Sequence, residues 1–209
     1  SNDIEIVEDE SEAENVIINT CGFIESAKQE SIDTIMRAVD LKIKGKLKNV
    51  YVAGCLSDRY KADLEKSIPE VDKYFGATDK PNTIKGILNE LGADYKNNLV
   101  GERTLTTPSH FAYLKISEGC DNPCSFCAIP IMRGAHRSKP LQEIMIEAQK
   151  LASKGVKEII VIGQDTTYWG FDLAERKRNL SLVLSELSKV NGIEWIRLMY
   201  AYPSRFPSD

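Results

Sequence analysis

The sequence has no apolar run near the ~18–20 residues that a membrane-spanning helix needs. Its first residues, Ser1-Asn2-Asp3, are polar and offer no secretory hydrophobic region. It also lacks the dense Lys and Arg runs that bind phosphates, and its formal net charge is -4. We therefore expect a cytoplasmic protein with no membrane contact, in which direct nucleic-acid contact is not indicated. The acidic balance suits a basic protein partner.

The number of cysteines is odd, since the 209 residues contain five. With no export signal, a disulfide framework is not expected, and metal binding or redox chemistry is the better explanation.

The first half alternates short apolar runs with segments of helical period. Strands are predicted at 15–20, 49–54 and 71–75. Helices are predicted after Ser26 with a stop at Gly45, at about 60–67 and at about 82–91. Ser26 and Gln29 are spaced as a capping box for the first helix. This pattern predicts a small flavodoxin-like parallel α/β domain over residues 1–93. The polar segment 94–109 is the predicted linker.

The second half repeats the strand–helix rhythm over residues 110–209. Strands are predicted at 111–116, 158–162 and 195–200, with helices before the second and third. These are the first three βα steps of a (β/α) barrel. Because three strands cannot close a barrel, we expect the natural protein to continue beyond Asp209.

Three cysteines follow the first strand of the second half with the spacing C-x3-C-x2-C, at Cys120, Cys124 and Cys127. Three thiolates hold three irons of a four-iron cubane and leave the fourth open to a reactant. Loops at the carboxyl ends of barrel strands build active sites, which suits this position. The alternative is structural zinc on the three cysteines and His136.

These three cysteines, with aromatic Phe126 before the last, resemble the radical S-adenosylmethionine (SAM) superfamily. The resemblance implies that the open iron chelates SAM, which is cleaved to a 5′-deoxyadenosyl radical, and that Phe126 packs near the adenine. A plain core aromatic is the alternative for Phe126.

Gln164 and Asp165 stand where many relatives carry Gly-Gly-Glu, which implies contact with the SAM amino group. Asp165 alternatively caps a turn.

A small basic loop follows the cluster motif, and it suggests a site for the SAM carboxylate or a substrate aspartate. A solvated loop is the alternative. The loop contains Arg133, His136, Arg137 and Lys139. Arg133 is the cofactor-binding candidate among them, and no residue is assigned a catalytic role.

Cys21 and Cys55 each follow a predicted parallel strand, so their thiols are expected at one crevice, either as metal ligands or as inert buried cysteines. Their contexts, Asn19-Thr20-Cys21-Gly22 and Ala53-Gly54-Cys55, resemble the amino-terminal domain of methylthiotransferases. The resemblance implies a second, auxiliary four-iron cluster whose third cysteine lies upstream of Ser1, since residues 1–14 contain none.

The segments Gly163-Gln164-Asp165-Thr166 and Trp195–Pro203 resemble the RimO-like branch of this family more than the tRNA-modifying, MiaB-like branch. That branch adds a methylthio group to the β-carbon of an aspartate in a small-subunit ribosomal protein. The resemblance implies two 4Fe-4S clusters and SAM as cofactors, with a ribosomal protein or the ribosome and an external electron donor as partners. A tRNA adenosine methylthiotransferase is the alternative.

Overall fold

The computed structural model describes residues 4–7, 9, 12–77, 80–94, 103–174 and 179–206. The chain divides into two compact units. The first comprises Ser1–Asn97 with Ile131–Arg133, and the second comprises Asn98–Pro130 with Gly134–Asp209. The predicted linker at 94–109 falls partly outside the described residues, and the predicted domain limits remain a prediction.

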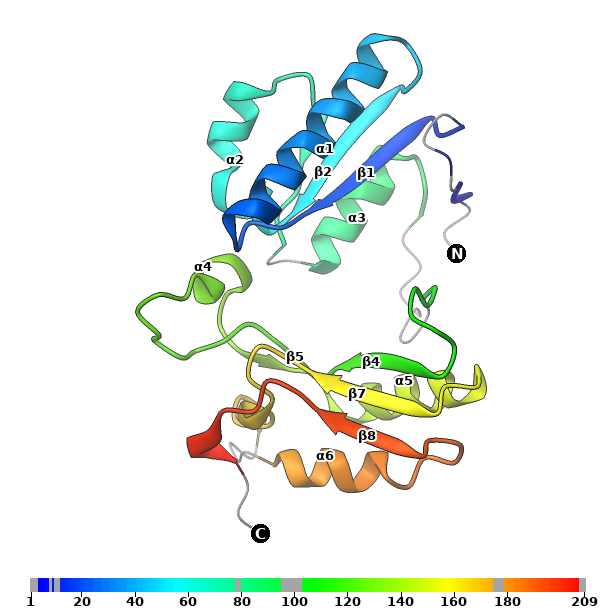
Figure 1. The fold of residues 1–209 in the computed structure, drawn as a ribbon, viewed down its shortest axis with the longest axis vertical. Coiled ribbons are helices and arrows are strands. Elements are labelled where there is room, and N and C mark those ends of the chain that lie inside the picture. Colours follow the sequence, from blue (N-terminus) through cyan, green and yellow to red (C-terminus); the bar gives the residue numbers. More distant parts are fainter. Residues whose placement is uncertain are drawn as a thin grey trace. The chain divides into compact units, whose positions relative to one another are not determined.

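The first unit is built on a three-stranded parallel sheet (Figure 1). Its strands are β1 (Asn15–Thr20), β2 (Asn49–Gly54) and β3 (Lys73–Tyr74), in the order β1-β2-β3. The register sets Thr20 opposite Gly54, so β1 and β2 end side by side. Their carboxyl ends therefore bring the residues after them, Cys21 and Cys55, to one edge of the sheet.

Helices cover both faces of this sheet. Val50 and Val52 are fully buried against α1 (Glu25–Ile43) and α2 (Cys55–Ser67). The alternate positions Tyr51 and Ala53 are buried in a separate cluster with Phe75 and with residues of and just after α3 (Lys80–Glu90). Burial on both faces explains why β2 is an almost continuous apolar run. The parallel α/β prediction for this half is confirmed.

Two local predictions in this unit are wrong. Ser26 and Gln29 form no capping box: α1 starts at Glu25, Ile24 is its cap residue without a side-chain hydrogen bond, and Gln29 bonds Asp33 instead. The second helix starts at Cys55 rather than near residue 60, since its first turn continues directly from β2 and bends at Tyr60.

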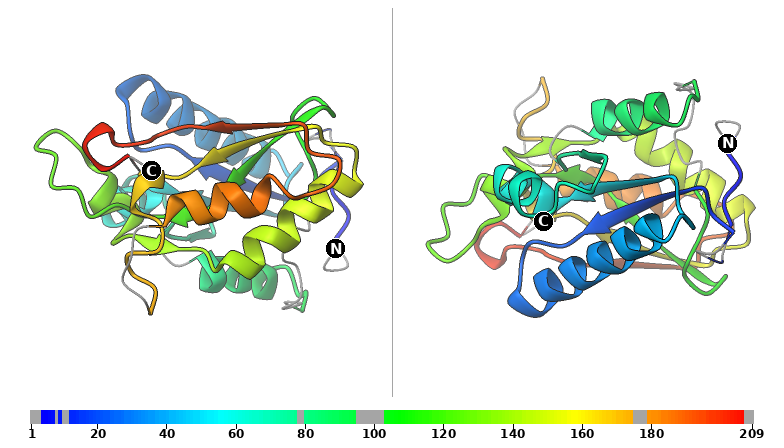
Figure 2. Two further views of the ribbon diagram at one scale, coloured as in Figure 1. Left: turned by 90° about the horizontal axis from the view of Figure 1, so that it is seen from below. Right: turned by 90° about the horizontal axis from the view of Figure 1, so that it is seen from above.

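The second unit carries a three-stranded parallel sheet of β4 (Phe111–Lys115), β7 (Glu158–Ile162) and β8 (Trp195–Leu198), in the order β4-β7-β8. Helices α5 (Leu141–Ser153) and α6 (Leu180–Leu187) lie on one face (Figure 2, left). Leu114, Ile159 and Val161 are fully buried beneath them. The three predicted βα steps are confirmed.

Several short elements lie at the carboxyl end of this sheet. β5 (Ser117–Glu118) pairs antiparallel with β6 (Arg137–Ser138), and this ribbon, which the sequence did not predict, brackets the cysteine loop. Helix α4 (Ile129–Arg133) follows that loop. Two 3-10 turns, η1 (Thr166–Tyr168) and η2 (Pro203–Arg205), follow β7 and β8. Within the described part of the chain, every helix is too short or too polar to cross a membrane.

Candidate iron–sulfur site

One backbone hydrogen bond ties the start of the cysteine loop to the segment after α4, and another closes a turn inside the loop. The Cys120 N–H donates to the Gly134 carbonyl at 3.2 Å, and the Cys127 N–H donates to the Cys124 carbonyl at 3.0 Å. Gly119 enters the loop with a φ of +77°, and a Cβ there would lie 2.1 Å from the Ala135 carbonyl oxygen. Only glycine fits both the conformation and the space.

All five cysteines are free thiols. Cys120 is buried, and Cys124 and Cys127 are half-buried. Among the residues that the structure describes, no three His, Cys, Asp or Glu side chains are placed to hold a metal ion, so the three loop sulfurs are not gathered about one point. Three unpaired thiols on one short anchored loop nevertheless match an iron–sulfur cluster in donor type and number.

Asn122 links this loop to the end of β7. Its Nδ2 donates to the Cys120 Sγ at 3.3 Å and to the Asp165 Oδ2 at 2.9 Å. The Asp165 carboxylate is 2% exposed and also accepts from the Thr167 backbone N–H at 3.0 Å and the Thr167 hydroxyl at 2.5 Å. Asp165 therefore caps η1, as the alternative interpretation of this residue predicted.

Arg205 completes the same network from the turn after β8. Its Nη1 donates to the Asn122 Oδ1 and lies 3.3 Å from the Asp165 Oδ2. Its guanidinium also lies over the rings of Tyr168 and Tyr202, 5.4 Å and 5.0 Å from their centroids. Arg205 and Asn122 were not predicted from the sequence as residues of the site. Arg205 is 83 residues from Asn122, so no local spacing signals the contact.

Two polar atoms beside this network have no hydrogen-bond partner among the described residues. They are the Ser117 Oγ, at the start of β5, and the Gln164 Oε1, just after β7. A Cβ on Gly163 would lie 2.5 Å from the Ser117 Oγ, so β5 and the segment after β7 approach closely here. The amide nitrogen of Gln164 has a partner, since its Nε2 donates to the Glu118 carboxylate at 2.9 Å. Buried polar atoms without a protein partner are rare in native proteins, and water, an ion or a ligand can satisfy them.

His136, predicted in the basic loop, is instead buried. Its Nε2 lies 3.1 Å from the Ser138 hydroxyl and 3.7 Å from Asp172, and its ring packs edge-on against Tyr168 at 4.9 Å. Burial lowers the pKa of His136 below its usual value, although Asp172 opposes this shift. The solvated-loop alternative is therefore wrong for His136, whose ring is held by Ser138 and Tyr168.

The other basic residues have different surroundings. Lys139 forms an ion pair with buried Glu147 at 2.5 Å. Arg137 is exposed, and Arg133 is half-buried in the last turn of α4. The cofactor-binding role of Arg133 and the anion-binding role of the loop stay predictions.

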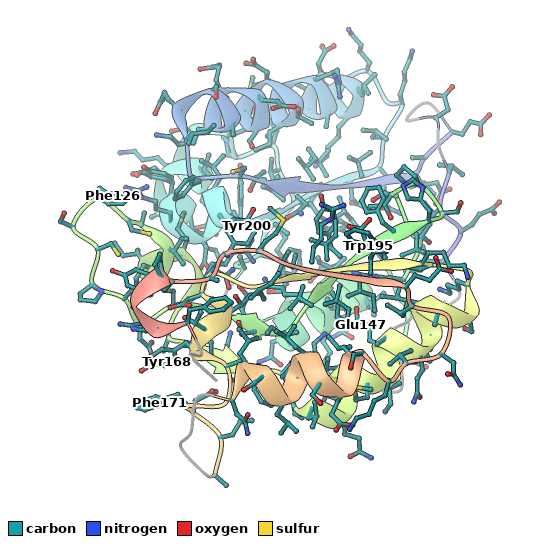
Figure 3. The ribbon with its side chains drawn as sticks, turned by 60° about the horizontal axis from the view of Figure 1, so that its bottom comes forward. Phe126, Glu147, Tyr168, Phe171, Trp195 and Tyr200 are labelled. Atoms are coloured by element: carbon teal, nitrogen blue, oxygen red, sulfur yellow. The ribbon has the colours of Figure 1, made fainter. Side chains whose placement is uncertain are left out.

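Phe126 is 90% exposed, and its ring projects from the cysteine loop (Figure 3). The alternative of a core aromatic is therefore wrong. Tyr168 and Phe171, which the figure also labels, pack together with ring centroids 4.9 Å apart.

In the first unit, glycines bring the segments around Cys21 and Cys55 together. A Cβ on Gly22 would lie 2.9 Å from the Cys55 carbonyl oxygen, and one on Gly54 would lie 2.4 Å from the Thr20 carbonyl oxygen. Cys21 is exposed, whereas Cys55 is 8% exposed at the start of α2. The backbone thus places both cysteines at one edge of the sheet.

Two protein families match separate parts of the chain. The family described as "Uncharacterized protein family UPF0004" matches residues 1–76, and the radical SAM superfamily matches residues 114–204. The chain is 56% identical over 209 residues to a protein of Christiangramia forsetii named ribosomal protein uS12 methylthiotransferase RimO, covering 100% of this chain and 45% of that one. Proteins of the same name from Cytophaga hutchinsonii and Chloroherpeton thalassium are 57% and 54% identical, covering 97% and 100% of this chain and 46% and 47% of theirs. The chain belongs to the radical SAM methylthiotransferase family.

The family membership confirms the resemblance inferred from the two cysteine motifs. The chain spans about half the length of the curated relatives that it matches. Among solved structures, TsrM from Kitasatospora setae, a radical SAM methyltransferase, matches with a TM-score of 0.52 and 13% identity, covering 86% of this chain and 42% of that one. At that identity the likeness bears on the fold alone.

Proposed function

We propose that this chain is part of a radical SAM methylthiotransferase that adds a methylthio group to the β-carbon of an aspartate in ribosomal protein uS12. The observation that carries the proposal is the C-x3-C-x2-C loop at the carboxyl end of β4 in a chain at least 54% identical to three RimO proteins. When bound, a four-iron cluster supplies one-electron chemistry with SAM. The chain binds and orients the cluster and SAM.

In this proposal Cys120, Cys124 and Cys127 hold the SAM-binding cluster. Cys21 and Cys55 are ligands of the auxiliary cluster, with a further ligand from outside this chain's 209 residues. Each set fits its group in donor chemistry, since every cysteine is a free thiol. The fold separates the two sets, one in each unit.

Gln164 is the proposed acceptor for the SAM amino group. Its Oε1 is buried without a partner among the described residues, as is the Ser117 Oγ beside it. Asp165, the neighbouring candidate, already accepts from Asn122, Thr167 and Arg205. An N–H of that amino group at Gln164 Oε1 would satisfy the orphaned acceptor.

Iron content per chain tests the two ligand sets. After anaerobic reconstitution of the protein, extended to the length of its relatives, with iron and sulfide, we expect a brown colour that dithionite bleaches. Cys124→Ala and Cys55→Ala should each remove about four irons. Cys21→Ala serves as a second test of the auxiliary set. A colourless protein that binds only zinc, or iron content unchanged by both substitutions, would contradict the proposal.

Mass spectrometry tests the substrate. The reconstituted protein, extended to the length of its relatives, is incubated with SAM, a reductant and either uS12 or tRNA. We expect uS12 to gain the mass of one CH2S unit on a single aspartate, and tRNA to remain unchanged. Modification of adenosine in tRNA alone would identify the tRNA-modifying branch instead.

A further inference from the structure

The Asn122 amide is held in one orientation by partners of opposite kind. Arg205 can only donate, and it meets the Oδ1, while ionised Asp165 can only accept, and it meets the Nδ2 at 2.9 Å. The second Nδ2 hydrogen is thereby directed at the Cys120 Sγ, 3.3 Å away. An amide turned by 180° would set like groups against each other on both sides.

These contacts join the loops that follow three neighbouring parallel strands. Asn122 follows β4, Asp165 follows β7, and Arg205 lies in η2 after β8. Asn122 is 9% exposed and Asp165 2%, and the Arg205 side chain is 25% exposed. Because the network is largely shielded from water, each hydrogen bond acts at low local dielectric and is stronger than a surface contact.

We propose that Asn122 is a positioning residue that donates a hydrogen bond to Cys120 and so raises the reduction potential of the cluster held by the cysteine loop. A donor at a ligating sulfur draws negative charge from it. The reduced cluster carries one more electron than the oxidised one, so the hydrogen bond stabilises the reduced form more. Asp165 and Arg205 act through Asn122 by fixing its amide.

This inference rests on the proposed cluster on Cys120, Cys124 and Cys127, and its test is chosen to keep the two separate. The full chain carries Cys21→Ala and Cys55→Ala, so that the signal belongs to the loop. Iron content and the midpoint potential, from a dithionite titration followed by electron paramagnetic resonance, are measured on the same samples.

The decisive variant is Asn122→Leu, which keeps a similar volume and removes the donor. We expect unchanged iron content and a lower midpoint potential, by about a tenfold change in the reduction equilibrium, which is ~59 mV for one electron. Asn179→Leu is the matched control. Asn179 accepts from the Leu182 N–H as the cap of α6, so its loss weakens a helix without touching the loop.

Arg205 gives a second route if Asn122→Leu fails to hold iron. Arg205→Met frees the amide to turn and should lower the potential in the same direction. Arg205→Lys, which retains a donor, should restore part of the shift. A wild-type potential in iron-loaded Asn122→Leu or Arg205→Met would overturn the inference and leave the cluster assignment intact. Absence of iron from the Cys21→Ala, Cys55→Ala protein that retains Asn122 would overturn both this inference and the proposed cluster on the cysteine loop.

Discussion

Gly119 lies so close to Ala135 that a Cβ on the glycine would fall 2.1 Å from the Ala135 carbonyl oxygen. The contact joins the start of the cysteine loop to the strand segment that closes it. We predict that Gly119→Ala strongly destabilises the second unit and abolishes iron binding to the loop. The free energy of unfolding from urea titrations, together with iron content, measures both effects.

Gly134→Ala is the matched control for Gly119→Ala. Gly134 also has a positive φ, of +71°, but a Cβ there would meet nothing within 4 Å. The substitution should therefore cost only the conformational term, ~1–3 kcal/mol at the φ and ψ of Gly134. Equal losses in the two variants would show that the approach to Ala135 has no special role.

Because the Asp165 carboxylate is buried, we predict that its neutralisation strongly lowers the free energy of unfolding. Asp165→Asn keeps the shape but removes the charge that faces Arg205 and one acceptor for the surrounding donors. Breaking a buried ion pair on one side costs about 3–5 kcal/mol, and the remaining exposure of Arg205 places the expected loss near ~3 kcal/mol. Urea denaturation of the purified variant measures it.

The exposed pair of Arg197 with Glu158 gives the comparison for Asp165. Glu158→Gln should cause a much smaller loss of stability, because water screens an exposed pair. A double-mutant cycle of Asp165→Asn with Arg205→Met should give a clear coupling energy. Additive losses at 165 and 205 would contradict a shared network.

His136 predicts a pH dependence of stability. Burial lowers its pKa in the folded protein, so the unfolded chain binds a proton at higher pH than the folded one. Its contribution to stability is complete above the unfolded pKa of about 6.5 and is lost as the pH falls from there through the folded pKa. Asp172, whose pKa is held down by hydrogen bonds from Ser138 against the effect of burial, loses its contribution only at lower pH, below about 3.8.

Urea titrations at about pH 7.5 and about pH 5.5 test this expectation for His136. The wild-type protein should lose more stability between the two values than His136→Gln does. His110→Gln is the control, because His110 is exposed. An equal pH dependence in wild type and His136→Gln would refute the role of His136.

Much of the fold was predictable because its signal is local and periodic. The apolar run of β2 and the alternation of strand and helix needed only neighbouring residues, and they gave the right elements in both units. The failures have physical reasons. Ser26 and Gln29 had the spacing of a capping box, but the cap residue of α1 is Ile24, two residues before Ser26, and Gln29 bonds within the helix.

The candidate site divides in the same way. Cys120 was predicted as a ligand from cysteine spacing after a strand, and Cys55 from its position at a strand end and its resemblance to the family; both assignments stay predictions. Asn122 and Arg205 were not predicted, because an amide and a guanidinium acquire meaning only when the loops after β4 and β8 meet at Asp165. Networks between loops distant in sequence depend on tertiary packing, which periodicity does not encode.

The different exposure of the cysteines predicts an order of reaction for the iron-free protein. The rate of alkylation of a thiol rises with the solvent exposure of its sulfur. Cys21 is exposed and should react first, Cys124 and Cys127 should follow, and Cys55 and Cys120, each 8% exposed, should react last. Peptide mass spectrometry over a time course of iodoacetamide treatment gives each rate. Urea should abolish the order, because local burial and not intrinsic reactivity creates it. If Cys55 reacted as fast as Cys21 in the folded protein, the close packing of Gly22 and Gly54 around the start of α2 would not describe the protein in solution.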